Sequence, residues 1–203
     1  MKLFTIFVFI STVVLGIEHT SLEQDSYVEV KAHGAVYKIK RDDDPHSRLT
    51  NTYAKTSRPS PPFFIEPFNA AKNVETYGEL EVLSFLEHQK GIFIDARLPN
   101  WYERSIIPSA INIPFKLFLT ESAKRKDVLQ YLGITVGNST LDFSNAKMIL
   151  LYCNGAWCGQ SPTAIKALIK LGYPPGKIKY YRGGMQSWQL LGLTTIIPQK
   201  ELK

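Results

Sequence analysis

The spacing of apolar and polar residues divides the chain into expected strands and helices. Residues 27–31 and 36–40 alternate apolar and polar side chains around the turn pair His33-Gly34, which predicts a β-hairpin. Two later runs are apolar throughout, as in strands that are buried on both faces, and lie at residues 92–94 and 148–152. Further strands are expected at residues 110–113 and 177–181.

Segments with helical spacing lie between these strands. Thr76 and Glu79 have the spacing of a capping box and predict a helix from Thr76 to about Gln89. Its expected core-facing residues are Leu80, Val82, Leu83, Phe85 and Leu86. Shorter helices are expected at residues 101–104, 127–132 and 185–191, and residues 133–145 read as an irregular insertion. Strands that alternate with helices predict an α/β fold, with a parallel sheet flanked by helices on both faces.

The stretch from residue 148 to residue 171 contains the candidate chemistry. Cys153 ends the apolar strand, residues 154–160 form a loop, and Ser161-Pro162 predicts an N-cap followed by a first helical turn. Gly172 is placed to cap the helix at its C-terminus. Free amides and the helix dipole favour an anion in such a loop, and a thiolate there has its pKa lowered from about 8.5 to roughly 3.5–7.5. The alternative is a buried, inert cysteine at the end of a core strand.

Three motifs of the chain resemble those of the rhodanese-like sulfurtransferases and occur in the order expected for that family. The first to be noted is the Cys153 loop. Residues 91–115 resemble the upstream family motif, in which an Asp-x-Arg strand end (Asp95, Arg97) leads to Ile-Pro-x-Ala-x-Asn-Ile-Pro, and residues 180–188 resemble the closing strand, Gly-Gly turn and Trp-bearing helix. The resemblance covers about residues 74–198 and implies a rhodanese-like fold. Trp188 is expected to fill the core.

The resemblance implies a two-step transfer of sulfane sulfur. Cys153 would attack the outer sulfur of a donor such as thiosulfate, and a thiophilic acceptor would then take the sulfur from the resulting persulfide. The loop expected to hold the persulfide consists of Asn154, Gly155, Ala156, Trp157, Cys158, Gly159, Gln160 and Ser161. Asp95 and Arg97 would be structural or near-site charges or a plain ion pair, and Arg182 is a further supporting candidate. No metal or organic cofactor is required.

The loop departs from the family pattern in two ways. The family usually places Arg or Lys five residues after the catalytic Cys, whereas this chain has Cys158 there, and the loop is about two residues longer. Upstream, Ser105, Ile106 and Ser109 stand where Gly, His and Gly are usual. Two alternatives therefore stay open: an exported thiol-disulfide or redox-sensing protein that cycles Cys153 and Cys158, and a non-catalytic binding module.

Two other cysteine chemistries fit less well. A cysteine phosphatase needs a closing Arg, and none occurs between Cys153 and Ser161. A Cys-His protease needs a histidine in a matching motif, and none of the four histidines lies in one. Both cysteines lie in the loop, so the chain has no disulfide framework.

The N-terminal region predicts export. Lys2 precedes an apolar run at residues 3–15, which is typical of a signal peptide comprising residues 1–16. An uncleaved leader that anchors the protein in a membrane is the alternative to a secreted or periplasmic protein. Residues 17–73 are interpreted as an extension with the hairpin and a proline-rich strap at residues 58–67, and residues 74–198 as the rhodanese-like domain. Asn138-Ser139-Thr140 fits a glycosylation acceptor.

The net charge of +6 is spread along the chain rather than concentrated in basic blocks. Its two densest clusters, residues 38–41 and 124–126, are each followed by acidic residues, as on a solvated surface. The excess is compatible with a small sulfur-containing anion or a thiol as substrate. We expect no nucleic-acid partner, because no corresponding motif is present.

Overall fold

The computed structural model describes residues 26–56, 65–137 and 140–198. Its central sheet contains five parallel strands in the order β3-β9-β8-β4-β5. These are β3 (Glu75–Tyr77), β4 (Ile92–Asp95), β5 (Ile111–Asn112), β8 (Ile149–Tyr152) and β9 (Ile178–Tyr181). The expected α/β class is confirmed, and β8, which leads into the cysteine loop, is the central strand.

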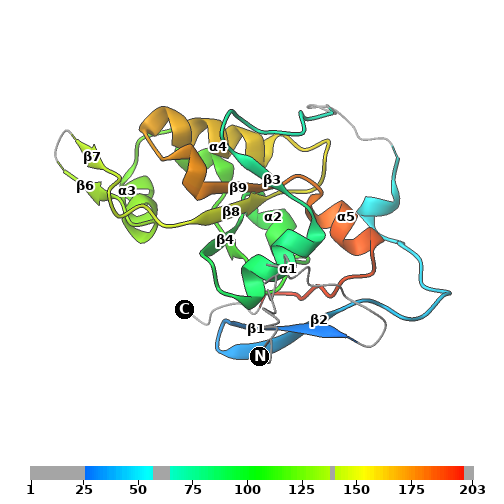
Figure 1. Cartoon of the computed structure of the whole chain (residues 1–203). Coiled ribbons are helices and arrows are strands. Elements are labelled where there is room, and N and C mark those ends of the chain that lie inside the picture. The colour runs from blue at the N-terminus through cyan, green and yellow to red at the C-terminus, as the bar shows by residue number, and fades with distance from the viewer. Residues whose placement is uncertain (1–25, 57–64, 138–139, 199–203) are drawn as a thin grey trace, which may run out of the picture.

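Two layers cover the sheet, as Figure 1 shows. The α-helices are α1 (Glu79–Glu87), α2 (Pro99–Tyr102), α3 (Ala123–Tyr131), α4 (Gln160–Leu171) and α5 (Gly184–Leu190). Short 3-10 helices occur at η1 (Thr52–Ala54), η2 (Phe115–Phe118) and η3 (Pro175–Lys177). Helices α3 and α4 contribute to the hydrophobic cluster on one face, and α1 and α5 to the cluster on the other.

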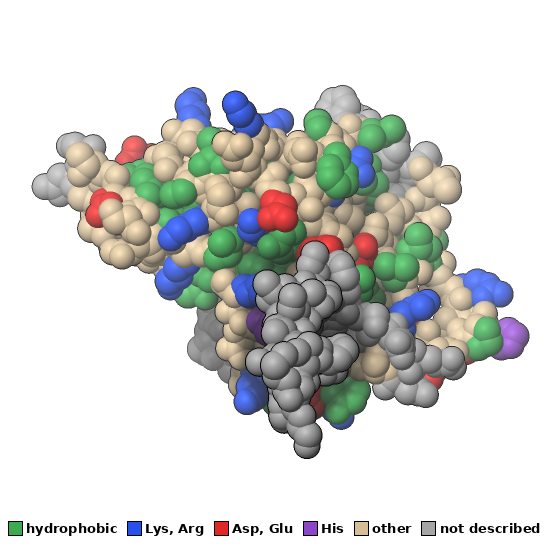
Figure 2. Space-filling model, viewed as in Figure 1, with side chains coloured by type: hydrophobic (Ala, Val, Ile, Leu, Met, Phe, Trp, Pro, Cys, Tyr) green, Lys and Arg blue, Asp and Glu red, His purple; other side chains and the backbone are tan. Residues whose placement is uncertain are grey.

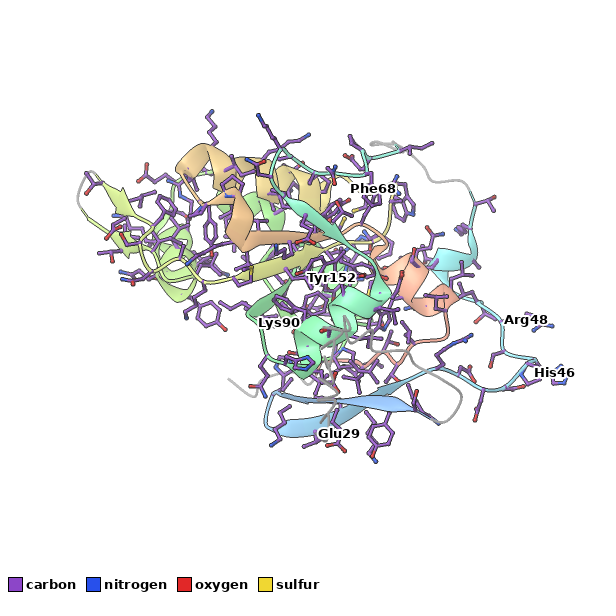
Figure 3. The ribbon with its side chains drawn as sticks, in the orientation of Figure 1. Glu29, His46, Arg48, Phe68, Lys90 and Tyr152 are labelled. Carbon is purple, nitrogen blue, oxygen red and sulfur yellow. The ribbon has the colours of Figure 1, made fainter. Side chains whose placement is uncertain are left out.

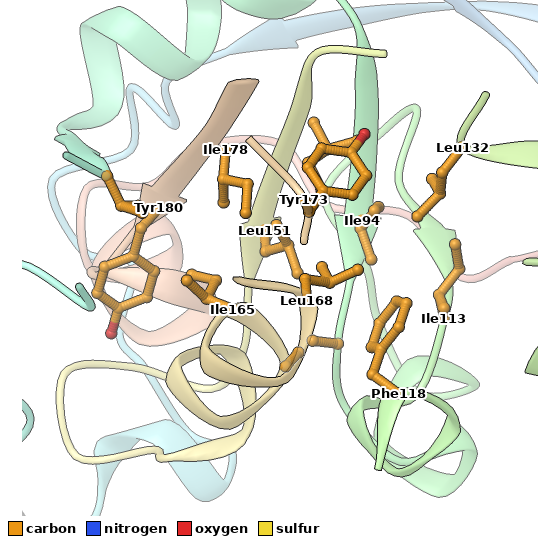
Figure 4. Close-up of a cluster of buried hydrophobic side chains, with 14 of the residues drawn as sticks. Ile94, Ile113, Phe118, Leu132, Leu151, Ile165, Leu168, Tyr173, Ile178 and Tyr180 are labelled. Atoms are coloured by element: carbon orange, nitrogen blue, oxygen red, sulfur yellow. The ribbon is translucent and has the colours of Figure 1, made fainter. Parts of the chain in front are cut away.

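The side chains of β8 alternate between these two clusters. Ile149 and Leu151 join the cluster under α4, which Figure 4 shows with Ile165, Leu168 and Tyr180. Leu150 and Tyr152 join the opposite cluster with Met185 and Trp188. Successive residues of a strand point to opposite faces, so a strand that is apolar throughout requires cover on both sides. Trp188 is fully buried, as expected of a core residue.

The predicted hairpin forms from β1 (Tyr27–Ala32) and β2 (Ala35–Lys40), which pair antiparallel. It lies along α1, on the side away from the sheet (Figure 1). Its buried residues Val28, Val30 and Ile39 extend the cluster that contains α1 and α5. After the hairpin, the chain continues alongside the segment that follows α5, where the N–H of Asp42 donates to the carbonyl of Gly192.

Several element boundaries differ from the sequence-based expectations. Residues 75–77 form strand β3 instead of the start of a helix, because they pair with β9, and the helix N-cap is Gly78. Glu81 accepts a hydrogen bond from the N–H of Gly78, so the capping pair lies two residues further along than predicted. Leu80, expected in the core, is 38% exposed.

Two other segments are more ordered than predicted. Helix α3 starts at Ala123 because Ser122 caps it, its hydroxyl accepting from the N–H of Arg125. The segment predicted to be irregular contains the antiparallel pair β6 (Thr135–Val136) and β7 (Leu141–Asp142). The predicted leader, residues 58–64 of the proline-rich strap, and Asn138 and Ser139 of the acceptor motif lie outside the described residues. No helix among the described residues has the length and apolar composition needed to cross a bilayer.

Candidate functional site

The candidate site is the loop between β8 and α4, residues 153–159, which we call the cysteine loop. Helix α4 begins at Gln160 with Gly159 as its N-cap, and the N–H of Thr163 donates to the carbonyl of Gly159. The prediction that Ser161 is the N-cap is therefore wrong, because Ser161 already lies inside the first turn. Gly172 caps the other end in a left-handed conformation, as predicted (φ +110°).

The start of α5 holds one side of the cysteine loop. The backbone N–H groups of Met185 and Gln186 donate to the carbonyls of Cys153 and Asn154, at 3.0 and 2.9 Å. Gly184 has φ +55°, and a Cβ at this position would meet the carbonyl of Cys153. The Gly-Gly turn therefore lets two chain segments approach each other closely.

The middle of the cysteine loop is held by side-chain and backbone contacts. The indole N–H of Trp157 donates to the side-chain oxygen of Gln186 at 2.7 Å. The carbonyl of Gly155 accepts from the N–H of Cys158 at 2.9 Å, and the carbonyl of Ala156 accepts from the N–H of Glu66. The loop is thus shaped by the fold on both sides.

Both cysteines are buried and form no disulfide, with 1% exposure for Cys153 and 5% for Cys158. The Sγ of Cys153 donates a hydrogen bond to the carbonyl of Cys158 at 3.0 Å. The Sγ of Cys158 accepts from Nδ2 of Asn154 at 3.6 Å, and the backbone amides of Asn154 and Gln160 also stabilise its thiolate. More donors therefore converge on Cys158 than on Cys153.

The electrostatics divide the two thiols into a protonated one and an anionic one. Burial, followed by the interaction with Cys158, raises the pKa of Cys153, against the opposing effect of the Ser161 hydroxyl and amide. The neighbouring Cys153 thiol contributes most to lowering the pKa of Cys158, to about 7, despite burial. This is the opposite direction from the one expected for Cys153. The structure thus favours Cys158 as the thiolate and Cys153 as the protonated thiol.

Asp95 and Arg97 form a fully buried ion pair beneath the loop. The guanidinium contacts the carboxylate through Nε at 2.9 Å and Nη2 at 2.5 Å. Its Nη1 donates to the hydroxyl of Tyr53 at 3.0 Å, and that hydroxyl is 2.8 Å from Oδ1 of Asn154. The Asp95–Arg97 ion pair therefore also supports the cysteine loop, through Tyr53 and Asn154.

The segment that departs from the family at Ser105, Ile106 and Ser109 supports this pair with its backbone. The carbonyl of Ser105 accepts from Nη2 of Arg97 at 2.6 Å, and Ile106 is fully buried. Ser109 has φ +76°, a conformation that glycine adopts with less strain. The glycine that is usual at this position in the family would therefore adopt this backbone conformation with less strain than Ser109 does.

Arg182 does not reach the thiols directly. Its Nε and Nη2 donate to the carbonyl of Glu66, at 3.1 and 2.8 Å. A Cβ on Gly159 would meet the carboxylate of Glu66, so this side chain lies against the start of α4. Arg182 therefore fastens residue 66 beside the cysteine loop.

Tyr53, Glu66 and Gln186 are site residues that sequence reasoning missed. Tyr53 comes from the N-terminal extension and is 6% exposed, within a segment whose other residues are mostly exposed. A single aromatic residue in a polar segment was the one available signal. Among the described residues, no group of three or more His, Cys, Asp or Glu is arranged to hold a metal ion.

Comparison with known proteins gives one family match. The model of the rhodanese-like domain matches residues 80–191, and no curated protein matches. Similar solved structures include the thiosulfate sulfurtransferase of Pseudomonas aeruginosa, with 20% identity and a TM-score of 0.45 over 63% of this chain and 21% of that one.

Two single-domain proteins are similar over most of their own length. They are the human sulfurtransferase TSTD1 (17% identity, TM-score 0.41, 59% of this chain and 97% of that one) and the Saccharomyces cerevisiae sulfurtransferase RDL2 (20%, 0.43, 59% and 91%). This chain spans only about a fifth of the Pseudomonas aeruginosa chain.

Proposed function

This chain belongs to the rhodanese-like domain family, and we propose that it is a sulfurtransferase that carries sulfane sulfur as a persulfide on Cys153. The donor class is a small sulfur-containing anion such as thiosulfate, and the acceptor is a thiol or another thiophile. The observation that carries this proposal is the hydrogen bond from the Cys153 thiol to the carbonyl of Cys158, which places a second thiol of lowered pKa beside it in the same loop.

Cys158 supplies the base that a protonated nucleophile needs. A thiol reacts as its thiolate, and a neighbouring group that accepts the proton activates it. The pKa of Cys158 is lowered to about 7, chiefly by the neighbouring Cys153 thiol, so the proton has an acceptor within the loop near neutral pH. Cys158 thus acts as a proton acceptor at the position where the family commonly places a cation, five residues after its catalytic Cys.

In the first step, the proton of Cys153 moves to the Cys158 thiolate, and the Cys153 sulfur attacks the outer sulfur of thiosulfate. A new S–S bond forms on Cys153 while the S–S bond of thiosulfate breaks, and sulfite leaves with the electron pair. The product is a persulfide anion on Cys153 beside a neutral Cys158 thiol. The total charge is unchanged.

In the second step, the acceptor attacks the outer sulfur of the persulfide. The S–S bond breaks, the acceptor keeps the sulfur atom, and Cys153 leaves as a thiolate that takes back the proton from Cys158. The resting pair is restored, and the cycle uses only side chains of this loop.

A second candidate is thiol-disulfide exchange, which the presence of two interacting thiols in one loop favours. The Cys158 thiolate would attack a substrate disulfide and release the first substrate thiol, and Cys153 would then attack the Cys158 sulfur of the mixed disulfide and release the second. The loop would become a Cys153–Cys158 disulfide, and the substrate would leave as two thiols.

Mass spectrometry after incubation with thiosulfate tests the proposal. The reduced wild-type chain should gain one sulfur atom that cyanide removes, and Cys153→Ser should gain none. Loss of two hydrogens across the pair after incubation with a disulfide, without sulfur uptake, would support the exchange reaction instead. If Cys153→Ser behaves as the wild type in both assays, a non-catalytic binding role replaces both reactions.

We also propose export to the periplasm or the extracellular medium through a signal peptide at residues 1–16. The apolar run at residues 3–15 supports this. N-terminal sequencing of the protein recovered outside the cytoplasm should begin near residue 17. Recovery of the intact leader in the membrane fraction would indicate an anchor instead.

A further inference from the structure

Three buried polar atoms near the cysteine loop have no hydrogen-bond partner: Oε1 of Gln160, Oγ of Ser161 and the hydroxyl oxygen of Tyr180. Ser161 and Tyr180 are fully buried. Leaving such a group unpaired is unfavourable, and folded proteins rarely do so. The two hydroxyls are donors without an acceptor in the resting structure.

Both hydroxyls belong to elements that flank Cys153. Tyr180 of β9 pairs with Leu151, two residues before Cys153, and its side chain extends beside Ile165 of α4 in Figure 4. Burial raises the pKa of Tyr180, so its hydroxyl keeps its proton. The hydroxyl of Ser161 stabilises a negative charge on Cys153 from the first turn of α4.

The resting thiol does not use these donors. The Sγ of Cys153 points its proton to the carbonyl of Cys158, and no hydrogen bond joins Sγ to Tyr180. A persulfide extends this side chain by one S–S bond of about 2.05 Å and places negative charge on the added sulfur. The acceptor that the hydroxyls lack in the resting structure is thus created by the reaction.

We infer that the hydroxyls of Ser161 and Tyr180 bind the terminal sulfur of the Cys153 persulfide. This inference rests on the proposed function. Two hydroxyl donors stabilise an anion by charge-assisted hydrogen bonds, which are stronger than neutral ones. They do so without a cation in the loop, since Arg182 is engaged with the carbonyl of Glu66. Gln160 is not part of this site, because its unpaired atom is an acceptor.

The equilibrium between free and persulfidated protein measures this stabilisation. The full chain is incubated with thiosulfate and sulfite at fixed ratios, and the persulfidated fraction is read by intact mass for Tyr180→Phe, Ser161→Ala and the wild type. Tyr173→Phe is the matched control, because this buried hydroxyl donates to the carbonyl of Lys147, away from the loop. Thermal unfolding is recorded for each variant.

We expect Tyr180→Phe and Ser161→Ala each to lower the equilibrium constant for persulfide formation about tenfold, which corresponds to about 1.4 kcal/mol. Tyr180→Phe should unfold no earlier than the wild type, because it removes an unpaired hydroxyl. Tyr173→Phe should charge normally but unfold earlier, because it loses a hydrogen bond.

The outcomes separate this inference from the proposed function. If Tyr180→Phe and Ser161→Ala charge as well as the wild type, the hydroxyl site is refuted while sulfur transfer stands. If the wild type accepts sulfur neither from thiosulfate nor from inorganic polysulfide, the proposed function is refuted, and the hydroxyl site with it.

Discussion

The hydroxyl of Tyr53 donates a hydrogen bond to Oδ1 of Asn154 and so connects the N-terminal extension to the cysteine loop. Arg97 has only donors, so its contact with Tyr53 leaves the phenol proton for Asn154. Oδ1 of Asn154 is thereby committed to Tyr53, and Nδ2 faces the sulfur of Cys158. In Figure 3, Tyr152, the strand residue just before the cysteine loop, lies inside the fold. His46 and Arg48, which belong to the N-terminal extension as Tyr53 does, project outward.

The first prediction concerns Tyr53→Phe. Without the hydroxyl, Asn154 loses the contact that orients its amide toward Cys158, and Arg97 loses an acceptor. The pKa of Cys158 should rise by roughly half to one unit, and stability should fall by about 1–3 kcal/mol. Thiolate absorbance against pH and urea unfolding measure these changes.

Tyr131→Phe is the control for this substitution, because Tyr131 is 51% exposed and lies on α3. It should leave the thiolate titration unchanged. An unchanged titration in Tyr53→Phe would show that the orientation of Asn154 does not depend on Tyr53.

The second prediction concerns pH. The pKa of Cys158 is lowered to about 7, so its thiolate, which accepts the Cys153 proton, is present above that pH and lost below it. The rate of sulfur uptake should therefore rise with pH, by about tenfold per unit below 7, and level off above it. Mass spectrometry of samples quenched at set times checks this between pH 5.5 and 9, at pH intervals of roughly half a unit. A rate that still rises at pH 9 would mean that the thiolate that controls sulfur uptake belongs to a cysteine whose pKa is not lowered.

The third prediction separates the two cysteines. Cys158→Ala removes the base but keeps the carrier, so sulfur uptake at pH 7 should fall by at least about tenfold and recover in part at high pH. Cys153→Ala should abolish uptake at every pH. If Cys158→Ala abolishes uptake and Cys153→Ala retains it, Cys158 is the carrier.

The fourth prediction concerns the ion pair beneath the loop. Asp95→Asn leaves the buried guanidinium of Arg97 without its counter-charge, which should lower the free energy of unfolding by about 3–5 kcal/mol. Glu75→Gln is the control, because Glu75 pairs with Lys179 at 2.7 Å but is 63% exposed. That substitution should cost at most about 1 kcal/mol in urea unfolding. Equal costs would mean that the buried pair contributes no more than a surface pair.

The fifth prediction concerns the turn before α5. Gly184→Ala places a Cβ against the carbonyl of Cys153 at a positive φ, so it should lower stability by about 2 kcal/mol and slow sulfur uptake. Gly176→Ala has free space around the added Cβ and should change neither. Thermal unfolding and sulfur uptake are measured on both variants. Normal uptake by a folded Gly184→Ala chain would show that the turn does not shape the loop.

The surface contributes less to these predictions than the interior does. Figure 2 shows Lys and Arg side chains spread among acidic and apolar ones on the visible face rather than in one patch. This agrees with the dispersed net charge in the sequence.

The sequence by itself determined the elements whose pattern is local. The hairpin follows from alternation around His33-Gly34, and the buried strands β4 and β8 follow from uninterrupted apolar runs. The position of Cys153 at the end of a buried strand, followed by a helix, also follows from this pattern. These features depend on neighbours a few residues away.

Only the tertiary structure decided what depends on contacts between distant segments. Thr76 became part of a strand because β9 was available to pair with it. The Asn154 side chain, one of several donors to the Cys158 sulfur, is oriented by Tyr53, a residue 101 positions earlier in the chain. A thiol pKa is set by the donors and the burial around the sulfur, and the fold brings these together from segments whose spacing in the sequence carries no sign of their proximity.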